Sequence, residues 1–170
     1  MPSQIGQCDS TILVSGSESA YQASQLYLQH LVQHVSYVGH SVGAAATLDL
    51  AFLSYLFAGI IGYVHAARAC QVEGVPIAAL NAMLTAAIPA MGPMITDQGK
   101  AIDSGDYSQP ESTLEICAQA VQLLSQQARD THIDASFPQF ATGLFKRALD
   151  AGLGAEKVGA LVKVLHDTTH

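Results

Sequence analysis

The chain opens with two short apolar runs on either side of an amphipathic segment. Residues 11–15 (Thr-Ile-Leu-Val-Ser) are rich in β-branched side chains and stop at Gly16, which predicts a buried strand. Apolar residues recur at helical spacing over about residues 18–34, and residues 35–38 predict a second strand that ends at Gly39. Because two strands and one helix do not form a stable sheet alone, we interpret this section as the end of a larger α/β domain.

The pattern after Gly43 predicts helices throughout. A long helix is expected from about residue 44 to residue 73, with Gly74 just beyond it as a favourable C-terminal residue. Residues 50–67 carry no formal charge, and about 18 apolar residues are enough to cross a bilayer. Polar side chains dilute this run, however. We therefore expect a helix buried in an oligomer and no membrane span.

Shorter helical segments follow the long helix. The first covers about residues 77–88, and Pro89 and Pro93 are expected to break or kink the chain before a segment that ends near residue 104. Ser112 and Glu115 have the spacing of a capping box at the start of the next helix. Two further helices are expected at about residues 136–151 and 155–165. The expected fold class is therefore mainly α.

Charge is scarce along the whole chain. Charged residues make up 12% of the 170 residues and hydrophobic residues 49%, so part of the surface is expected to be buried by a partner. The net charge of -7 argues against nucleic acid as a partner, because phosphate binding needs clustered cations.

The cysteines and histidines show no convincing metal or disulfide pattern. Cys8, Cys70 and Cys117 are odd in number and far apart, which favours a reducing, cytoplasmic setting. The N-terminus lacks the basic and apolar regions of a signal peptide. His30 and His34 have the i, i+4 spacing of two metal ligands on one helix, but no acidic residue stands near them, so no metal site is expected.

Several short motifs follow one another in register over nearly the whole chain. They are, in chain order, Pro2–Gly6, Thr11–Ser17, Thr47–Leu53, Ile88–Met91, Ile102–Tyr107, Thr113–Glu115 and Ala148–Gly152. Each motif is weak alone, but together they resemble the imine reductase and reductive aminase family. That family belongs to the 6-phosphogluconate-dehydrogenase-like oxidoreductases, which are related to the β-hydroxyacid dehydrogenases.

The resemblance implies a specific architecture. Members of the family have an N-terminal Rossmann domain for NADPH, a long interdomain helix and a helical bundle through which two subunits intertwine. By resemblance, residues 1–42 are a small α/β remnant of the end of the Rossmann-like domain. Residues 43–170 are then the helical domain for dimerisation and substrate binding, led by the long interdomain helix.

The chain departs from the family at the cofactor motif. No G-x-G-x-x-G follows a strand and opens a helix, and Gly39 and Gly43 lack the required spacing. We therefore expect no cofactor to be bound by this chain alone, with NADP(H) serving the complete family enzyme. Met1 falls where the family's chain is in mid-domain, so the expectation is a fragment or a gene that begins at an internal methionine.

Asp49 is the candidate catalytic residue. It lies near the start of the long apolar helix, and by resemblance it matches the family's proton-donating position. A carboxyl group desolvated by apolar neighbours has a raised pKa and delivers a proton near neutral pH. The alternative is that a helix N-terminus simply favours a carboxylate.

Candidate substrate-binding residues lie on the same helix and beyond it. Leu53 and Phe57 follow Asp49 at i+4 and i+8, and Phe57 replaces a tyrosine that many relatives carry, although ordinary core packing also accounts for it. Three methionines are candidates for an adaptable apolar pocket, with core packing again the alternative. They are Met83, Met91 and Met94.

The sequence thus predicts the substrate-binding and dimerisation half of an NADPH-dependent imine reductase or reductive aminase. The expected partners are a second copy of the chain and a small amine, imine or related apolar substrate. Two alternatives remain open. One is a stand-alone cyclase or isomerase that uses Asp49 as an acid without redox chemistry, and the other is a silent dimerisation module.

Overall fold

The structure, a computed structural model, describes residues 10–166 of the chain. Cys8 and the matching stretch Pro2–Gly6 lie outside the described residues. The chain divides into two compact units, residues 1–60 and residues 61–170.

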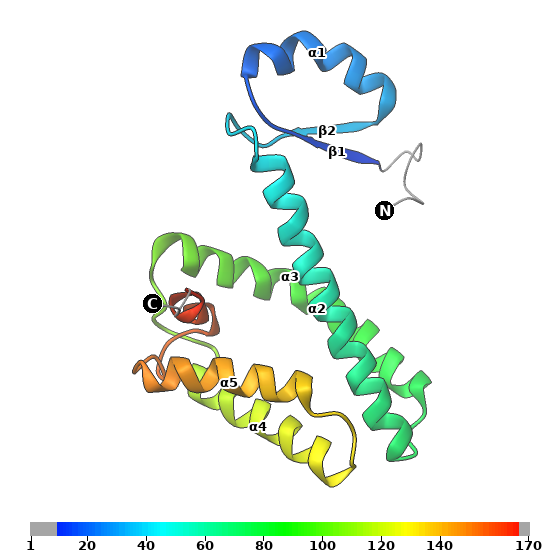
Figure 1. The fold of residues 1–170 in the computed structure, drawn as a ribbon, viewed down its shortest axis with the longest axis vertical. Helices are drawn as coiled ribbons and strands as arrows, with labels where there is room; N and C mark the ends of the chain where they lie inside the picture. Colours follow the sequence, from blue (N-terminus) through cyan, green and yellow to red (C-terminus); the bar gives the residue numbers. More distant parts are fainter. Residues whose placement is uncertain (1–9, 167–170) are drawn as a thin grey trace. The chain divides into compact units, whose positions relative to one another are not determined.

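The first unit contains a small β–α–β arrangement (Figure 1). Strand β1 (Thr11–Val14) pairs in parallel with β2 (His34–Tyr37), and helix α1 (Glu18–Leu31) connects them. The expected order of strand, helix and strand is confirmed. The expected helix extends too far, because the chain leaves α1 at Val32 in an extended conformation and His34 already belongs to β2.

Helix α2 (Ala44–Val72) confirms the predicted long helix. It ends before Gly74, whose φ of 71° lies in the left-handed region that glycine adopts without steric cost. Only Ala69 of this helix is buried within the chain. The fold of the single chain does not explain why so apolar a helix is so little buried.

Helix α3 (Ile77–Ser104) is continuous, so of the break or kink expected at Pro89 and Pro93 the break is wrong. A proline in a helix removes one backbone donor and frees the carbonyl four residues earlier. The two prolines are four residues apart and both are exposed, so the defects share one face that is open to solvent. By length and composition alone, α2 and α3 are each apolar enough to cross a bilayer.

The last helices form a compact end to the second unit. Helices α4 (Leu114–Asp130) and α5 (Ser136–Asp150) lie side by side as a hairpin, and the short 3-10 helix η2 (Val158–Val164) follows (Figure 1). The expected final α-helix over residues 155–165 is thus wrong in type and begins later. The mainly α fold class is confirmed.

The N-terminus of α4 is capped one residue later than the sequence predicts. The hydroxyl of Thr113 accepts a hydrogen bond from the backbone N–H of Ile116 at 3.3 Å. Ser112 is therefore not the capping residue, and the predicted capping box with Glu115 is wrong. Thr113 also pairs with Lys157 in an isolated bridge, which fixes the chain at this point and decides which hydroxyl caps the helix.

The core of the second unit lies where α4 begins and η2 packs. Leu114 is fully buried at its centre. Gly159 of η2 donates its backbone N–H to Gln98 Oε1 of α3 at 2.6 Å, and Lys157 Nζ lies 2.9 Å from Asp97 Oδ1. These contacts join the end of the chain to α3. The remaining side chains of this core are Ala101, Tyr107, Ala148, Ala160 and Val164.

Candidate functional site

Asp49 is the sixth residue of α2 and its side chain is exposed. No hydrogen bond or ion pair engages its carboxylate among residues 10–166. The helix dipole acts mainly within the first turn, and Asp49 lies beyond it, so a favourable helix terminus explains this residue poorly. Its own helix does not desolvate it in the single chain, contrary to expectation. Only a molecule bound against α2 can do so.

Leu53 and Phe57 share the helix face of Asp49 because they follow it at i+4 and i+8 within continuous α2. Leu53 is half-buried, whereas 55% of Phe57 remains exposed. Ordinary core packing within this chain does not account for a phenylalanine that is so open. The three residues form a stripe of one carboxylate and two apolar side chains.

The three candidate methionines share one face of α3. Met91 and Met94 follow Met83 at i+8 and i+11, which returns to the same side of a helix after two and three turns. Met83 and Met94 are largely exposed and Met91 is half-buried. Packing in the core of this chain therefore fails to explain two of the three. This second stripe belongs to the second unit, whereas that of Asp49 belongs to the first.

Asp49 is a lone negative charge within a long apolar stretch of α2. It is the only formally charged residue between Ala44 and Ala67 of α2. A carboxylate among apolar side chains attracts a cation and offers nothing to an anion. This surface therefore suits a protonated amine or iminium group better than a carboxylate or phosphate.

The histidines do not form the metal pair that their spacing allows. His30 lies in the last turn of α1 and its Nδ1 contacts the carbonyl oxygen of Leu26, whereas His34 is the first residue of β2. The i, i+4 relation within one helix is thus lost. Within the described residues, no group of three or more histidine, cysteine or acidic side chains is arranged to hold a metal ion.

Helices α1 and α2 each begin after a strand, and a helix N-terminus in that position can bind the pyrophosphate of a dinucleotide. Glu18 stands in the first turn of α1, where its carboxylate opposes the negative charge of a pyrophosphate. The turn before α2 contains Gly39 and Gly43 without the third glycine of a dinucleotide motif. The residues at these two helix starts therefore do not fit the pyrophosphate of NADPH.

Two cavities lie in the second unit, and neither is lined by a predicted site residue. One, of about 290 Å³, is lined by side chains of α2, α4 and α5, including His65, Cys70 and Phe137. The His65 ring lies 5.6 Å from that of Phe137, and its Nε2 is buried without a hydrogen-bond partner among residues 10–166.

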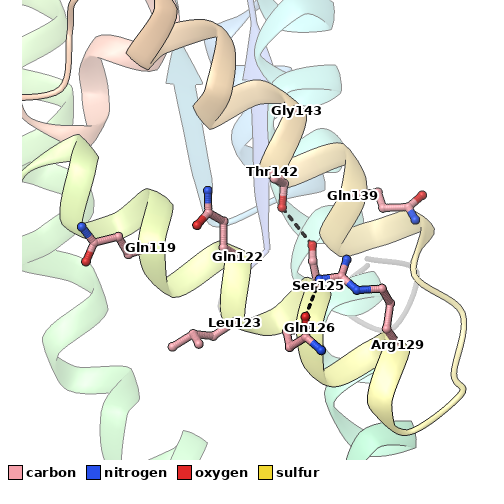
Figure 2. Close-up of a pocket in the computed structure, with 9 residues that line it drawn as sticks. All are labelled: Gln119, Gln122, Leu123, Ser125, Gln126, Arg129, Gln139, Thr142 and Gly143. Atoms are coloured by element: carbon pink, nitrogen blue, oxygen red, sulfur yellow. Dashed lines mark hydrogen bonds between the residues drawn. The ribbon is translucent and has the colours of Figure 1, made fainter.

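The other cavity is a groove along the hairpin of α4 and α5 (Figure 2). Four of its nine lining residues are glutamines, and Arg129 is the cation among them. The apolar periodicity of α4 did not point to these polar positions. The signal that was available is the regular spacing of Gln119, Gln122 and Gln126.

Comparison with known proteins relates most of the chain to one family. Residues 41–167 match the family model described as "NADPH-dependent reductive aminase-like, C-terminal domain". The NADPH-dependent reductive aminase of Aspergillus oryzae is 26% identical over 96% of this chain and 56% of its own length. The L-threonate dehydrogenase of Pectobacterium atrosepticum is also 26% identical, over 95% of this chain and 52% of its own length. The chain thus spans about half the length of these relatives.

Solved structures agree with the fold. A reductive aminase from Aspergillus terreus, in complex with NADPH and ethyl levulinate, superimposes with a TM-score of 0.85. It is 27% identical and is matched over 98% of this chain and 58% of its own. An imine reductase from Myxococcus stipitatus gives a TM-score of 0.90 at 24% identity, over 98% of this chain and 61% of its own, which supports the fold alone. The chain therefore belongs to the NADPH-dependent reductive aminase-like family, as its C-terminal domain.

Proposed function

We propose that this chain is the substrate-binding and dimerisation half of an NADPH-dependent imine reductase or reductive aminase. The observation that carries the proposal is Asp49, the only formally charged residue between Ala44 and Ala67 of the apolar helix α2, with an exposed carboxylate. The match of residues 41–167 to the reductive aminase-like domain supports it.

In this proposal Asp49 recognises the substrate nitrogen. A carboxylate forms a charge-assisted hydrogen bond to a protonated amine or iminium N–H. In the complete enzyme that we propose, Asp49 assists protonation of the imine nitrogen as a general acid. Leu53 and Phe57 extend the contact to apolar substituents. Met83, Met91 and Met94 are proposed to contact apolar parts of a substrate along α3.

A second copy of the chain is proposed to cover α2 and α3. Apolar side chains exposed in such number on two helices indicate a surface that is buried in an assembly. Neither helix carries the charged face of a helix that stays in solvent. The exposed large hydrophobic side chains are Leu48, Leu50, Phe52, Tyr55, Phe57, Ile60, Ile61, Tyr63, Val64 and Val72 on α2, and Met83, Ile88, Met94, Ile95 and Ile102 on α3.

The cofactor is proposed to be held outside the residues described here. Glu18 at the start of α1 and the glycine spacing before α2 both disfavour a pyrophosphate at these positions. NADP(H) supplies the hydride in the complete family enzyme that we propose. A cytoplasmic setting without membrane or nucleic-acid partners completes the proposal, and the free thiols of Cys70 and Cys117 are compatible with it.

A second candidate is oxidation of a small hydroxy acid, because the curated relatives include L-threonate dehydrogenases. A carboxylate substrate needs a cation at its binding site. The face of Asp49 offers the opposite charge, and α2 has no cation before Arg68. The charge of this face therefore favours the amine or imine.

Binding of a saturated cyclic amine tests the proposal without requiring turnover. Calorimetric titration of the full chain is expected to show saturable binding that Asp49→Asn weakens about tenfold or more, because a charge-assisted hydrogen bond is lost. Asp103→Asn is the matched control, since it makes the same charge change at an exposed position near the end of α3. Equal loss in both variants contradicts the proposed role of Asp49.

A further inference from the structure

The groove between α4 and α5 is unlike the rest of the surface. It has a volume of about 780 Å³, within the range of about 300–1,000 Å³ that is common for small-molecule sites. Figure 2 shows polar side chains of both helices around it. None of the lining side chains is a carboxylate, although the chain has 14 acidic residues and only 7 lysines and arginines.

The wall contributed by α4 is a periodic stripe of amides. Gln119, Gln122 and Gln126 recur at i, i+3 and i+7, which places them on one face of the helix. Each amide offers both donors and an acceptor. Gln139 of α5 adds another. Such a wall suits a ligand with several hydroxyl groups, because a hydroxyl also donates and accepts.

The groove is built on a rigid base. The hydroxyls of Ser125 and Thr142 share a hydrogen bond of 2.9 Å between the two helices, and Ser125 is 5% exposed. Helices that are tied together in this way keep the width of the groove fixed. A preformed site loses little entropy when a ligand binds.

Arg129 supplies the single charge, and its neighbours orient it. Its Nη2 donates to Gln126 Oε1 at 2.7 Å, and Gln126 Nε2 donates to Asp130 Oδ1 at 2.6 Å. Asp130 is therefore bonded to the amide and does not line the groove. A guanidinium has five N–H donors in a planar fork, so donors remain for a carboxylate.

We propose that this groove binds a small polyhydroxylated carboxylate at a site separate from the face of Asp49. The carboxylate pairs with Arg129, and the hydroxyl groups bond to the amides of Gln122, Gln126 and Gln139. An ammonium ion finds no anionic partner in this lining. The charge of the groove is thus opposite to that of the Asp49 face.

Nuclear magnetic resonance of the isotopically labelled full chain tests this, with sodium L-threonate as the probe. Saturable shifts are expected in the side-chain amide signals of Gln122, Gln126 and Gln139. Arg129→Gln is expected to weaken threonate binding about tenfold or more. Arg147→Gln is the control with the same charge change, on α5 but outside the groove.

Two further titrations separate the contributions. Gln122→Leu removes an amide without a change in charge, so it is expected to weaken the binding of threonate more than that of acetate. The uncharged polyol erythritol is expected to bind the unchanged chain more weakly than threonate does. The amide spectrum of each variant confirms that the fold is kept. The proposal is overturned if threonate gives no saturable shifts, if Arg129→Gln and Arg147→Gln behave alike, or if the shifts map to α2 instead. Because Asp49 takes no part, this result is independent of the amine titration.

Discussion

Asp49 and Phe57 lie on one face of α2, two helical turns apart, and both side chains are exposed. A carboxylate and an aromatic ring at this spacing present one charge and one apolar surface in line. Within a single chain neither side chain contributes to a core. Their positions make sense as part of a surface that another molecule covers.

Phe57→Ala is expected to weaken the dimer and leave the single chain's stability within about 0.5 kcal/mol, because exposed side chains contribute little to folding. Sedimentation equilibrium measures the first effect, and urea unfolding at a concentration where the chain is monomeric measures the second. Leu114→Ala is the contrasting variant, since truncation of this fully buried side chain should lower the free energy of unfolding by about 2–5 kcal/mol. An unchanged dimer affinity in Phe57→Ala would argue against the dimer face proposed for α2.

Gly159→Ala is expected to destabilise the chain by about 1–3 kcal/mol. An added Cβ would lie 2.9 Å from Gln98 Oε1 and 3.4 Å from the Gln98 carbonyl oxygen, so the side chain that accepts the Gly159 N–H must move. Gly99→Ala on α3 is the control, because nothing lies within 4 Å of its added Cβ. It should stabilise the helix by about 0.5–1 kcal/mol. Equal midpoints in urea for both variants would contradict the packing described for η2.

Thr113→Ala should cost about 0.5–2 kcal/mol, because it removes the hydroxyl that caps α4. Ser112→Ala serves as its neighbouring control and is expected to change little, since Ser112 is exposed and not at the cap. Thermal unfolding of both variants compares them directly. A larger loss of stability in Ser112→Ala than in Thr113→Ala would instead support the predicted capping box of Ser112 and Glu115.

Stability is expected to depend on Asp134 at acidic pH. The backbone N–H and the hydroxyl of Ser136 donate to its carboxylate, which lowers the pKa of Asp134 in the folded chain. The unfolded chain then binds more protons, so this stabilisation is present above the ordinary aspartate pKa of about 3.9 and is lost as the pH falls through the lowered value.

Asp134→Asn should therefore lower the urea midpoint near neutral pH. Its effect on the midpoint should shrink as the pH falls from the ordinary aspartate pKa through the lowered pKa of Asp134. Urea titrations of both proteins across the acidic range supply the comparison. A constant difference between them at every pH would mean that the ionised form of Asp134 is not what stabilises the fold.

The helices were predictable from the sequence because their apolar residues recur regularly and glycines mark their ends, as Gly74 does for α2. The continuity of α3 was not. Proline alone predicts an interruption, and only the structure shows that Pro89 and Pro93 place their defects on one exposed face. The cap at Thr113 likewise depends on a bridge to Lys157, far along the chain.

The candidate site was predictable only as single residues. The helical spacing of Asp49, Leu53 and Phe57 fixes their common face once α2 is known to be continuous. The groove on α4 and α5 was not predicted, because it depends on how these two helices pack against each other. The apolar periodicity of each helix does not reveal it. Whether a side chain such as Phe57 packs in a core or on a partner is a property of the assembly, which one chain's sequence does not encode locally.

A crystal structure of the full chain grown with NADPH and a saturated cyclic amine would test the proposed role of Asp49 and the proposed dimer together. We expect a dimer with α2 covered, the amine nitrogen within hydrogen-bond distance of the Asp49 carboxylate, and no dinucleotide ordered against residues 10–166. NADPH bound at the start of α1 or α2, or an amine bound away from Asp49, would contradict it.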